Sequence, residues 1–114
     1  MSNEHGLIIE IDGAEQPLVR LRGEIDLRSS PMLRERLLDL VERRPQRVIL
    51  DLSDVQYMDS SGVGTVVELK RRLDRAGAPI VLVGLQPRVR SVFEITKLDQ
   101  FFKIVDTVEQ AQQA

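Results

Sequence analysis

The sequence predicts an α/β fold in which a mixed central sheet of about five strands is flanked by about four helices. Two observations lead to this prediction. First, the segments 7–11 and 18–21 alternate apolar and polar residues on either side of a turn, which is typical of an antiparallel hairpin. Second, the rest of the chain alternates amphipathic helical patterns with short apolar runs, which is typical of strands connected through helices.

The hairpin turn is predicted at 12–17, Asp-Gly-Ala-Glu-Gln-Pro, because these residues suit turns. The second strand closes at 23–26, Gly-Glu-Ile-Asp, where the glycine lets the backbone turn. A first helix then starts at Ser29-Ser30-Pro31, with a capping serine followed by proline. The apolar residues that follow at helical spacing form one face of this helix, namely Leu33, Leu37, Leu40 and Val41. Pro45 ends the helix.

The central stretch of the chain is 48–64. Val48 to Leu52 predicts a strand buried on both faces, followed by a short acidic loop. A helix begins at 59–62, Asp-Ser-Ser-Gly, because aspartate and serine are capping residues. Its core-facing residues are expected to be Val63, Val66, Leu69, Leu73 and Ala76, and Val67 is expected to widen this apolar face.

The remaining segments predict a strand at 79–84, a helix from Gln86-Pro87, a strand at 103–105 and a short helix at 108–111. Residues 1–5 and 112–114 are expected to be loose termini of one domain, 1–114. No apolar run is long enough to span a bilayer, so we expect a cytoplasmic protein without membrane insertion.

The composition disfavours several function classes. The chain has no cysteine, which removes disulfides and thiol chemistry. Its net charge of −2 and its four aromatic residues argue against nucleic-acid binding. We interpret the basic clusters at 43–47 and 70–75 as charged helix ends, since cations complement the helix dipole there.

Ser60 is the candidate functional residue. Unpaired amides and the dipole at a helix start favour an anion, so a phosphate added to this hydroxyl would meet backbone donors. The alternative is that the segment is an ordinary helix cap. Gly62 and Gly64 likewise permit two interpretations, close packing against the sheet or open access for a partner's surface.

Two motifs give the chain a family resemblance. The run 57–64, Tyr-Met-Asp-Ser-Ser-Gly-Val-Gly, resembles the signature of STAS domains, specifically bacterial anti-sigma factor antagonists, and 23–26 resembles that family's second motif. The resemblance extends from about Gly6 to Val108 and implies a STAS-like sandwich. It also implies a phosphorylation site at Ser60, with Ser61 as second choice. The implied partner-binding residues are Glu24, Asp26, Asp59, Ser60, Ser61, Gly62, Val63 and Gly64.

The resemblance further implies a partner-switching circuit. The unphosphorylated domain would bind an anti-sigma factor that is also a serine kinase, and the sigma factor would be released. Phosphorylation of Ser60 would separate the complex, and a serine phosphatase would reverse it. ATP and Mg²⁺ would belong to the kinase, so we expect no cofactor on this chain, which would act as a monomer or a weak dimer.

Two rival interpretations stay open at this stage. One is a STAS domain used as a fixed, unphosphorylated subunit of a lipid-transport or stress-signalling assembly. The other is a small enzyme that uses Asp51, Asp54 and Asp59 as a metal or phosphoacceptor cluster. We interpret these aspartates as turn and cap residues. The chain has no Gly-Lys-Ser/Thr phosphate loop, and no histidine follows the serines to act as a base, so we expect neither catalysis nor a metal site.

Overall fold

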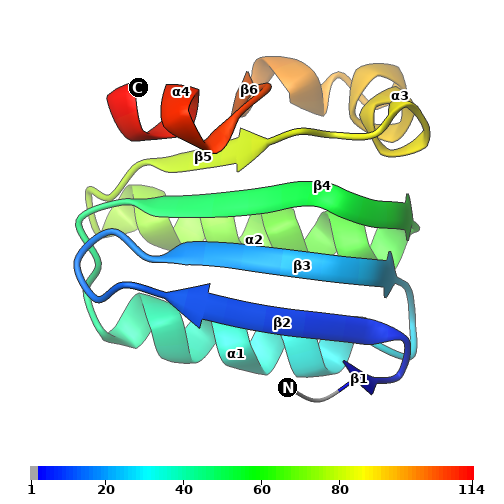
Figure 1. Ribbon diagram of the computed structural model, residues 1–114, viewed down its shortest axis with the longest axis horizontal. Helices are drawn as coiled ribbons and strands as arrows, with labels where there is room; N and C mark the ends of the chain where they lie inside the picture. The colour runs from blue at the N-terminus through cyan, green and yellow to red at the C-terminus, as the bar shows by residue number, and fades with distance from the viewer. Residues whose placement is uncertain (1–2) are drawn as a thin grey trace.

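The computed structural model describes residues 3–114, which form one six-stranded mixed sheet with four α-helices (Figure 1). The strands lie in chain order, from β1 at one edge to β6 at the other. Strands β1 to β3 are antiparallel, and β3 to β6 are parallel. The elements are β1 Asn3–Glu4, β2 Leu7–Asp12, β3 Leu18–Ile25, α1 Ser30–Glu42, β4 Val48–Met58, α2 Ser60–Arg75, β5 Ile80–Val83, α3 Pro87–Ile95, a 3₁₀ turn Leu98–Gln100, β6 Lys103–Val105 and α4 Val108–Gln113.

The predicted α/β class is confirmed, and the five predicted strands correspond to β2 through β6. The ends of the chain differ from the prediction. Residues 3–4 pair with β2 as an extra strand, and residues 112–113 belong to α4. The part of the loose N-terminus predicted at residues 1–2 lies outside the described residues.

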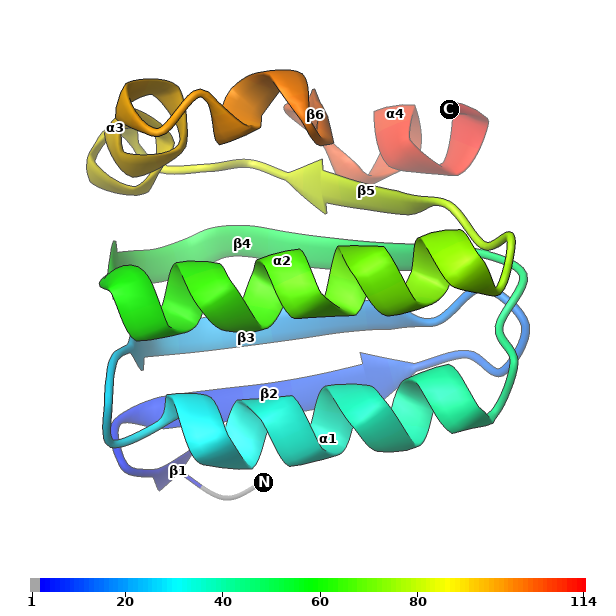
Figure 2. The ribbon, with the colours of Figure 1, turned by 180° about the vertical axis from the view of Figure 1, so that it is seen from behind.

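The two long helices, α1 and α2, lie side by side over one face of the sheet (Figure 2). Between them and the sheet lies the main core, which contains leucines from both helices and fully buried residues of β4 such as Leu50 and Leu52. Ala76, which was expected to face the core, is instead exposed, because α2 ends at Arg75 and Ala76 is its C-cap. Successive side chains of a strand point to opposite faces. Ile49 therefore joins a second cluster on the other face, where Ala111 of α4 packs on it together with Val81 and Val83.

The structure corrects the acidic loop predicted after Leu52. Strand β4 continues to Met58, and β3 pairs with it from Ile49 to Met58. Two register shifts in this pairing break the simple alternation of apolar and polar residues, so the segment 53–57 does not look like a strand in the sequence. The consequence is that β4 delivers the chain directly to the start of α2.

The described helices include none that is long and apolar enough to cross a membrane.

Candidate functional site

The carboxyl ends of β3 and β4 bring the two sequence motifs together. Ile25 pairs with Met58 at the end of the parallel ladder, and the Asp59 amide donates a hydrogen bond of 3.1 Å to the Ile25 carbonyl. Asp26 and Asp59 therefore follow neighbouring strands at the same edge of the sheet. The structure therefore places Asp26 beside the loop that carries Ser60, while the functional roles assigned to the two acids stay predictions.

Asp59 caps helix α2 as the sequence predicted. Its Oδ1 accepts hydrogen bonds from the Ser61 amide at 2.9 Å, the Gly62 amide at 3.2 Å and the Ser61 hydroxyl at 2.6 Å. The Ser61 hydroxyl is the main cause that holds the pKa of Asp59 below its ordinary value of 3.8, while desolvation and the charge of Asp26 oppose this shift. Asp59 is therefore a carboxylate at neutral pH.

The two serines have different environments. The Ser61 hydroxyl is engaged by Asp59, and its carbonyl accepts a hydrogen bond from the Thr65 hydroxyl at 3.0 Å. Ser60 is exposed, and its hydroxyl forms no hydrogen bond with any residue from 3 to 114. Ser60 thus offers the more accessible hydroxyl at the start of α2, and the order of preference for the phosphorylation site stays a prediction.

The structure also changes the expected anion site. The Ser61 and Gly62 amides, which were expected to face an added phosphate, already donate to Asp59. A phosphate on Ser60 would therefore meet a carboxylate at the helix start rather than two free backbone donors. The helix dipole still favours negative charge there, but the Asp59 carboxylate already accepts the hydrogen bonds of these two amides.

Asp26 is bound within its own turn. Its Oδ1 accepts from the Arg28 amide at 2.9 Å and the Ser29 amide at 3.3 Å, and its Oδ2 accepts from Arg28 Nη2 at 3.0 Å. The hydrogen bond from the Arg28 side chain is the largest cause that lowers the pKa of Asp26. The same guanidinium lies 3.8 Å from the Glu24 carboxylate. The acids of the second motif therefore share one cation.

The predicted helix start at Ser29-Ser30-Pro31 is confirmed, with Ser29 at the N-cap position of α1, but the Ser29 hydroxyl makes no capping hydrogen bond to the helix. The hydroxyl instead donates to the Glu24 carbonyl at 2.9 Å and accepts from the Asp26 amide at 3.0 Å. The Ser29 amide in turn donates to the Asp26 carbonyl at 3.1 Å. Ser29 is fully buried, so it stabilises the turn that presents Asp26 rather than the helix end itself.

The glycines and valine of the serine motif divide between core and surface. A Cβ added to Gly62 would lie 2.7 Å from Ile25 Cγ2 and 2.8 Å from Met58 Cγ, so Gly62 permits close packing on the sheet. Val63 is buried in the same core. A Cβ on Gly64 would meet nothing within 4 Å. Gly62 and Val63 therefore support the loop from inside, and Gly64 is available to a partner.

Two residues next to Asp26 were missed by the sequence reasoning. Leu27 has 77% of its surface exposed, although leucine is usually found inside, and Arg28 binds Asp26 as described. Both lie in the turn between β3 and α1, where no periodic pattern indicates which side chains point outward. They place one exposed apolar group and one cationic group beside Asp26.

The proposed aspartate cluster does not assemble. Asp51 lies 3.8 Å from Arg20, Asp54 lies 3.8 Å from Arg22, and Asp59 caps α2. Within residues 3–114 no three potential metal ligands come together. These aspartates are accounted for by pairing and capping.

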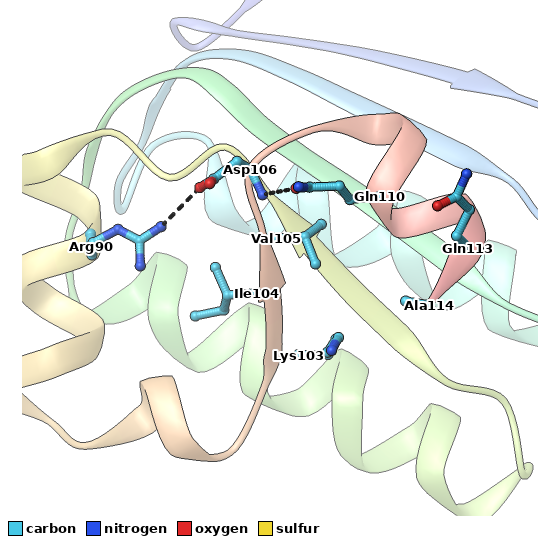
Figure 3. A pocket seen from close by; sticks show the side chains of 8 residues that line it. All are labelled: Arg90, Lys103, Ile104, Val105, Asp106, Gln110, Gln113 and Ala114. Atoms are coloured by element: carbon cyan, nitrogen blue, oxygen red, sulfur yellow. Dashed lines mark hydrogen bonds and ion pairs between the residues drawn. The ribbon is translucent and has the colours of Figure 1, made fainter.

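A surface hollow of about 520 Å³ lies elsewhere, beside β6 between α3 and α4 (Figure 3). Arg90, Lys103 and Gln110 line it, and Arg90 lies 3.9 Å from Asp106. None of the residues that line it belongs to the predicted site.

The fold and the serine loop together define a STAS domain. The family model described as "STAS domain" matches residues 8–111, so the chain belongs to this family. The chain is 38% identical over 86 residues to the "Anti-sigma-B factor antagonist" of Bacillus subtilis. The matched region covers 75% of this chain and 78% of that relative.

Solved structures agree with this assignment. An anti-sigma factor antagonist from Mycobacterium paratuberculosis superposes with a TM-score of 0.87 at 24% identity, over 99% of this chain and 97% of that one, and so shares the fold. The unphosphorylated form of the anti-sigma factor antagonist SpoIIAA gives a TM-score of 0.78 at 27% identity, over 92% and 91% of the two chains. The phosphorylated form of SpoIIAA, from Bacillus, gives 0.73 at 26% identity, over 94% and 96%.

Proposed function

We propose that this chain is an anti-sigma factor antagonist that binds its anti-sigma factor while Ser60 is unmodified and releases it when Ser60 carries a phosphate. The observation that supports this most directly is the exposed, unengaged Ser60 hydroxyl at the start of α2, beside Asp59. Its similarity to SpoIIAA, whose structures include phosphorylated and unphosphorylated forms, supports the same function.

The proposed circuit places the catalysis on other proteins. The anti-sigma factor is itself a serine kinase that carries the ATP and Mg²⁺, and a serine phosphatase restores the unmodified form. This chain is then the substrate and the binding partner, and it catalyses no reaction. Its candidate contact groups are Ser60, Gly64, Asp59 and the acids of the second motif, Glu24 and Asp26.

The charges around Ser60 supply the physical basis of release. A phosphate adds between about 1.5 and 2 negative charges at neutral pH. Asp59 is already ionised at neutral pH, and its carboxylate already accepts hydrogen bonds from the Ser61 and Gly62 amides. These two amides are therefore not free to offset the negative charge of a phosphate on Ser60. We therefore expect a large change in surface potential and little change in fold. A loss of about 2.8 kcal/mol on covering this charge in an interface would weaken binding about a hundredfold.

The proposal is tested by incubating the protein with ATP and a lysate of its native cells, followed by peptide-mapped mass spectrometry. Wild type, Ser60→Ala and Ser61→Ala are compared. A phosphate that maps to Ser60 and disappears in Ser60→Ala is the expected result. Phosphate on Ser61 would move the site, and no phosphate in a kinase-active lysate would favour the fixed-subunit alternative.

Calorimetry with the purified anti-sigma factor then tests the switch. Ser60→Asp should bind at least about tenfold more weakly than wild type, because it places a permanent charge in the interface. Ser91→Asp is the matched control, since Ser91 is also an exposed serine on a helix. Equal affinity of Ser60→Asp and wild type would show that the charge at Ser60 does not control binding.

A further inference from the structure

The outward side of α2 carries a line of residues that starts at the serine loop. Gly64, Val67, Arg71 and Arg75 follow one another at spacings of three and four residues, so they lie along one side of the helix. Gly64, Arg71 and Arg75 are exposed, and Val67 at the edge of the line is half-buried, because part of its side chain packs against the main core. Figure 2 shows that none of the described elements covers the side of α2 that faces away from the sheet. We call these four residues the outer stripe of α2.

The outer stripe carries cations whose charge is not balanced within the domain. Arg71 and Arg75 form no ion pair with any residue in the described part of the chain. Both acids of α2 are already paired: Glu68 is bound by Arg34 at 2.7 Å and by Arg72 at 3.0 Å, and Asp74 lies 2.9 Å from Lys70. Glu68 accepts hydrogen bonds from Arg34 and Arg72. These hydrogen bonds, that of Arg34 first, lower the pKa of Glu68, so it stays ionised and paired.

The surface along the stripe is hollowed. A hollow of about 390 Å³ is lined by Gly64 and Val67 at one end and by Arg71, Arg72 and Arg75 at the other. Glu68 also lines it, and its carboxylate is paired with Arg34 and Arg72. A second hollow of about 340 Å³ shares Arg72 and Arg75 and extends toward Arg44 of the α1 end. The surface therefore passes from an apolar part near Ser60 to a cationic part about 20 Å away, at the helix rise of about 1.5 Å per residue.

We infer that the outer stripe of α2 is a docking surface for an acidic segment of the anti-sigma factor kinase, and that this contact positions the kinase's active site on Ser60. The inference rests on the proposed function. Gly64 permits close approach next to the acceptor serine, Val67 supplies an apolar contact, and Arg71 with Arg75 attract carboxylates. Unpaired arginines at an interface rim increase the association rate and select a partner of opposite charge.

A capping role alone does not account for these residues. Cations in the last turn of a helix complement its dipole, which explains Arg72 and Arg75. Arg71 lies before the last turn, and a dipole contribution requires neither the open side at Gly64 nor the hollow that joins it to the arginines. Nucleic acid is the other polyanion such a surface attracts, but the chain as a whole has a net charge of −2.

The test is the rate of Ser60 phosphorylation in native lysate with ATP, read by mass spectrometry on the intact domain. Arg71→Glu/Arg75→Glu should lower the rate at least about tenfold relative to wild type, and Arg71→Lys/Arg75→Lys should stay within about threefold. The matched control is Arg36→Glu/Arg43→Glu. This pair makes the same charge change at the exposed side of α1, where neither arginine forms an ion pair with the described residues.

Salt and nuclease complete the design. Raising NaCl from about 50 to about 300 mM should slow wild type more than the Glu variant, because screening acts on the attraction that the variant has lost. The docking surface would be overturned, and the proposed function kept, if wild type and Arg71→Glu/Arg75→Glu were phosphorylated at equal rates. The same conclusion would follow if Arg36→Glu/Arg43→Glu lowered the phosphorylation rate as much as Arg71→Glu/Arg75→Glu does. Loss of the difference after nuclease treatment would assign the stripe to nucleic acid. Absence of Ser60 phosphate in wild type would instead overturn the proposed function.

Discussion

The substitution of alanine at Gly62 and at Gly64 tests the packing of the serine loop on the sheet. Both residues lie in the first turns of α2, so alanine should improve helix propensity by about 1 kcal/mol at either position. At Gly64 the new methyl group meets nothing within 4 Å, so the variant should be up to about 1 kcal/mol more stable.

At Gly62 the same methyl group would overlap the core. The added Cβ would lie 2.7 Å from Ile25 and 2.8 Å from Met58, closer than carbon atoms approach one another. Overpacking of this kind costs about 1 to 3 kcal/mol, which equals or exceeds the gain in propensity. Gly62→Ala should therefore be less stable than Gly64→Ala by about 1 to 3 kcal/mol.

Urea denaturation of wild type and the two variants measures this difference. A Met58→Ala background provides a second check, because it removes one of the two atoms that the new methyl group would meet. The cost of Gly62→Ala should be smaller in that background. If Gly62→Ala proved at least as stable as Gly64→Ala, the close contact between the α2 start and the ends of β3 and β4 would be wrong.

Three further predictions concern the residues that support the site. The pKa of Asp59 is lower in the folded chain than its ordinary value of 3.8, so its contribution to stability is present at neutral pH and is lost as the pH falls below about 4. Asp59→Asn keeps a capping oxygen but has no carboxyl group that titrates. The difference in unfolding free energy between this variant and wild type, measured by urea denaturation, should therefore become smaller as the pH falls from about 5 to about 3. A difference that does not change with pH would refute the role of the Asp59 charge. Ser29→Ala removes a fully buried hydroxyl that is hydrogen-bonded to the backbone of Glu24 and Asp26, so it should lower the free energy of unfolding by about 1 to 3 kcal/mol in thermal or urea denaturation. A change below about 0.5 kcal/mol would show that these hydrogen bonds do not stabilise the turn before α1. Arg34 and Glu68 join α1 to α2 by two hydrogen bonds of 2.7 and 2.9 Å. A double-mutant cycle on this pair should give a coupling free energy of about 0.5 to 1 kcal/mol in unfolding experiments, and added salt should reduce it. A coupling free energy of zero at low salt would show that this exposed pair does not stabilise the contact between the helices.

The local features of this protein were readable from the residues alone. Apolar periodicity predicted the helices and the buried part of β4, because a helix or strand that covers a core must place its apolar residues on one side. The cap at Asp59 was also predictable, since it depends on residues two and three positions away. The motif at 57–64 indicated the STAS family, which the matching family model confirmed.

Features that depend on long-range pairing required the folded chain. Strand β4 extends past Leu52 because β3 pairs with it across two register shifts, and this pairing places Asp26 beside Asp59. The difference between Gly62 and Gly64 depends on what lies opposite each glycine, which no spacing reveals. The same holds for the two serines. Both are capping residues in the sequence, but the Asp59 carboxylate engages one hydroxyl and leaves the Ser60 hydroxyl at the surface, because a hydrogen bond depends on distances of about 3 Å between atoms that folding brings together.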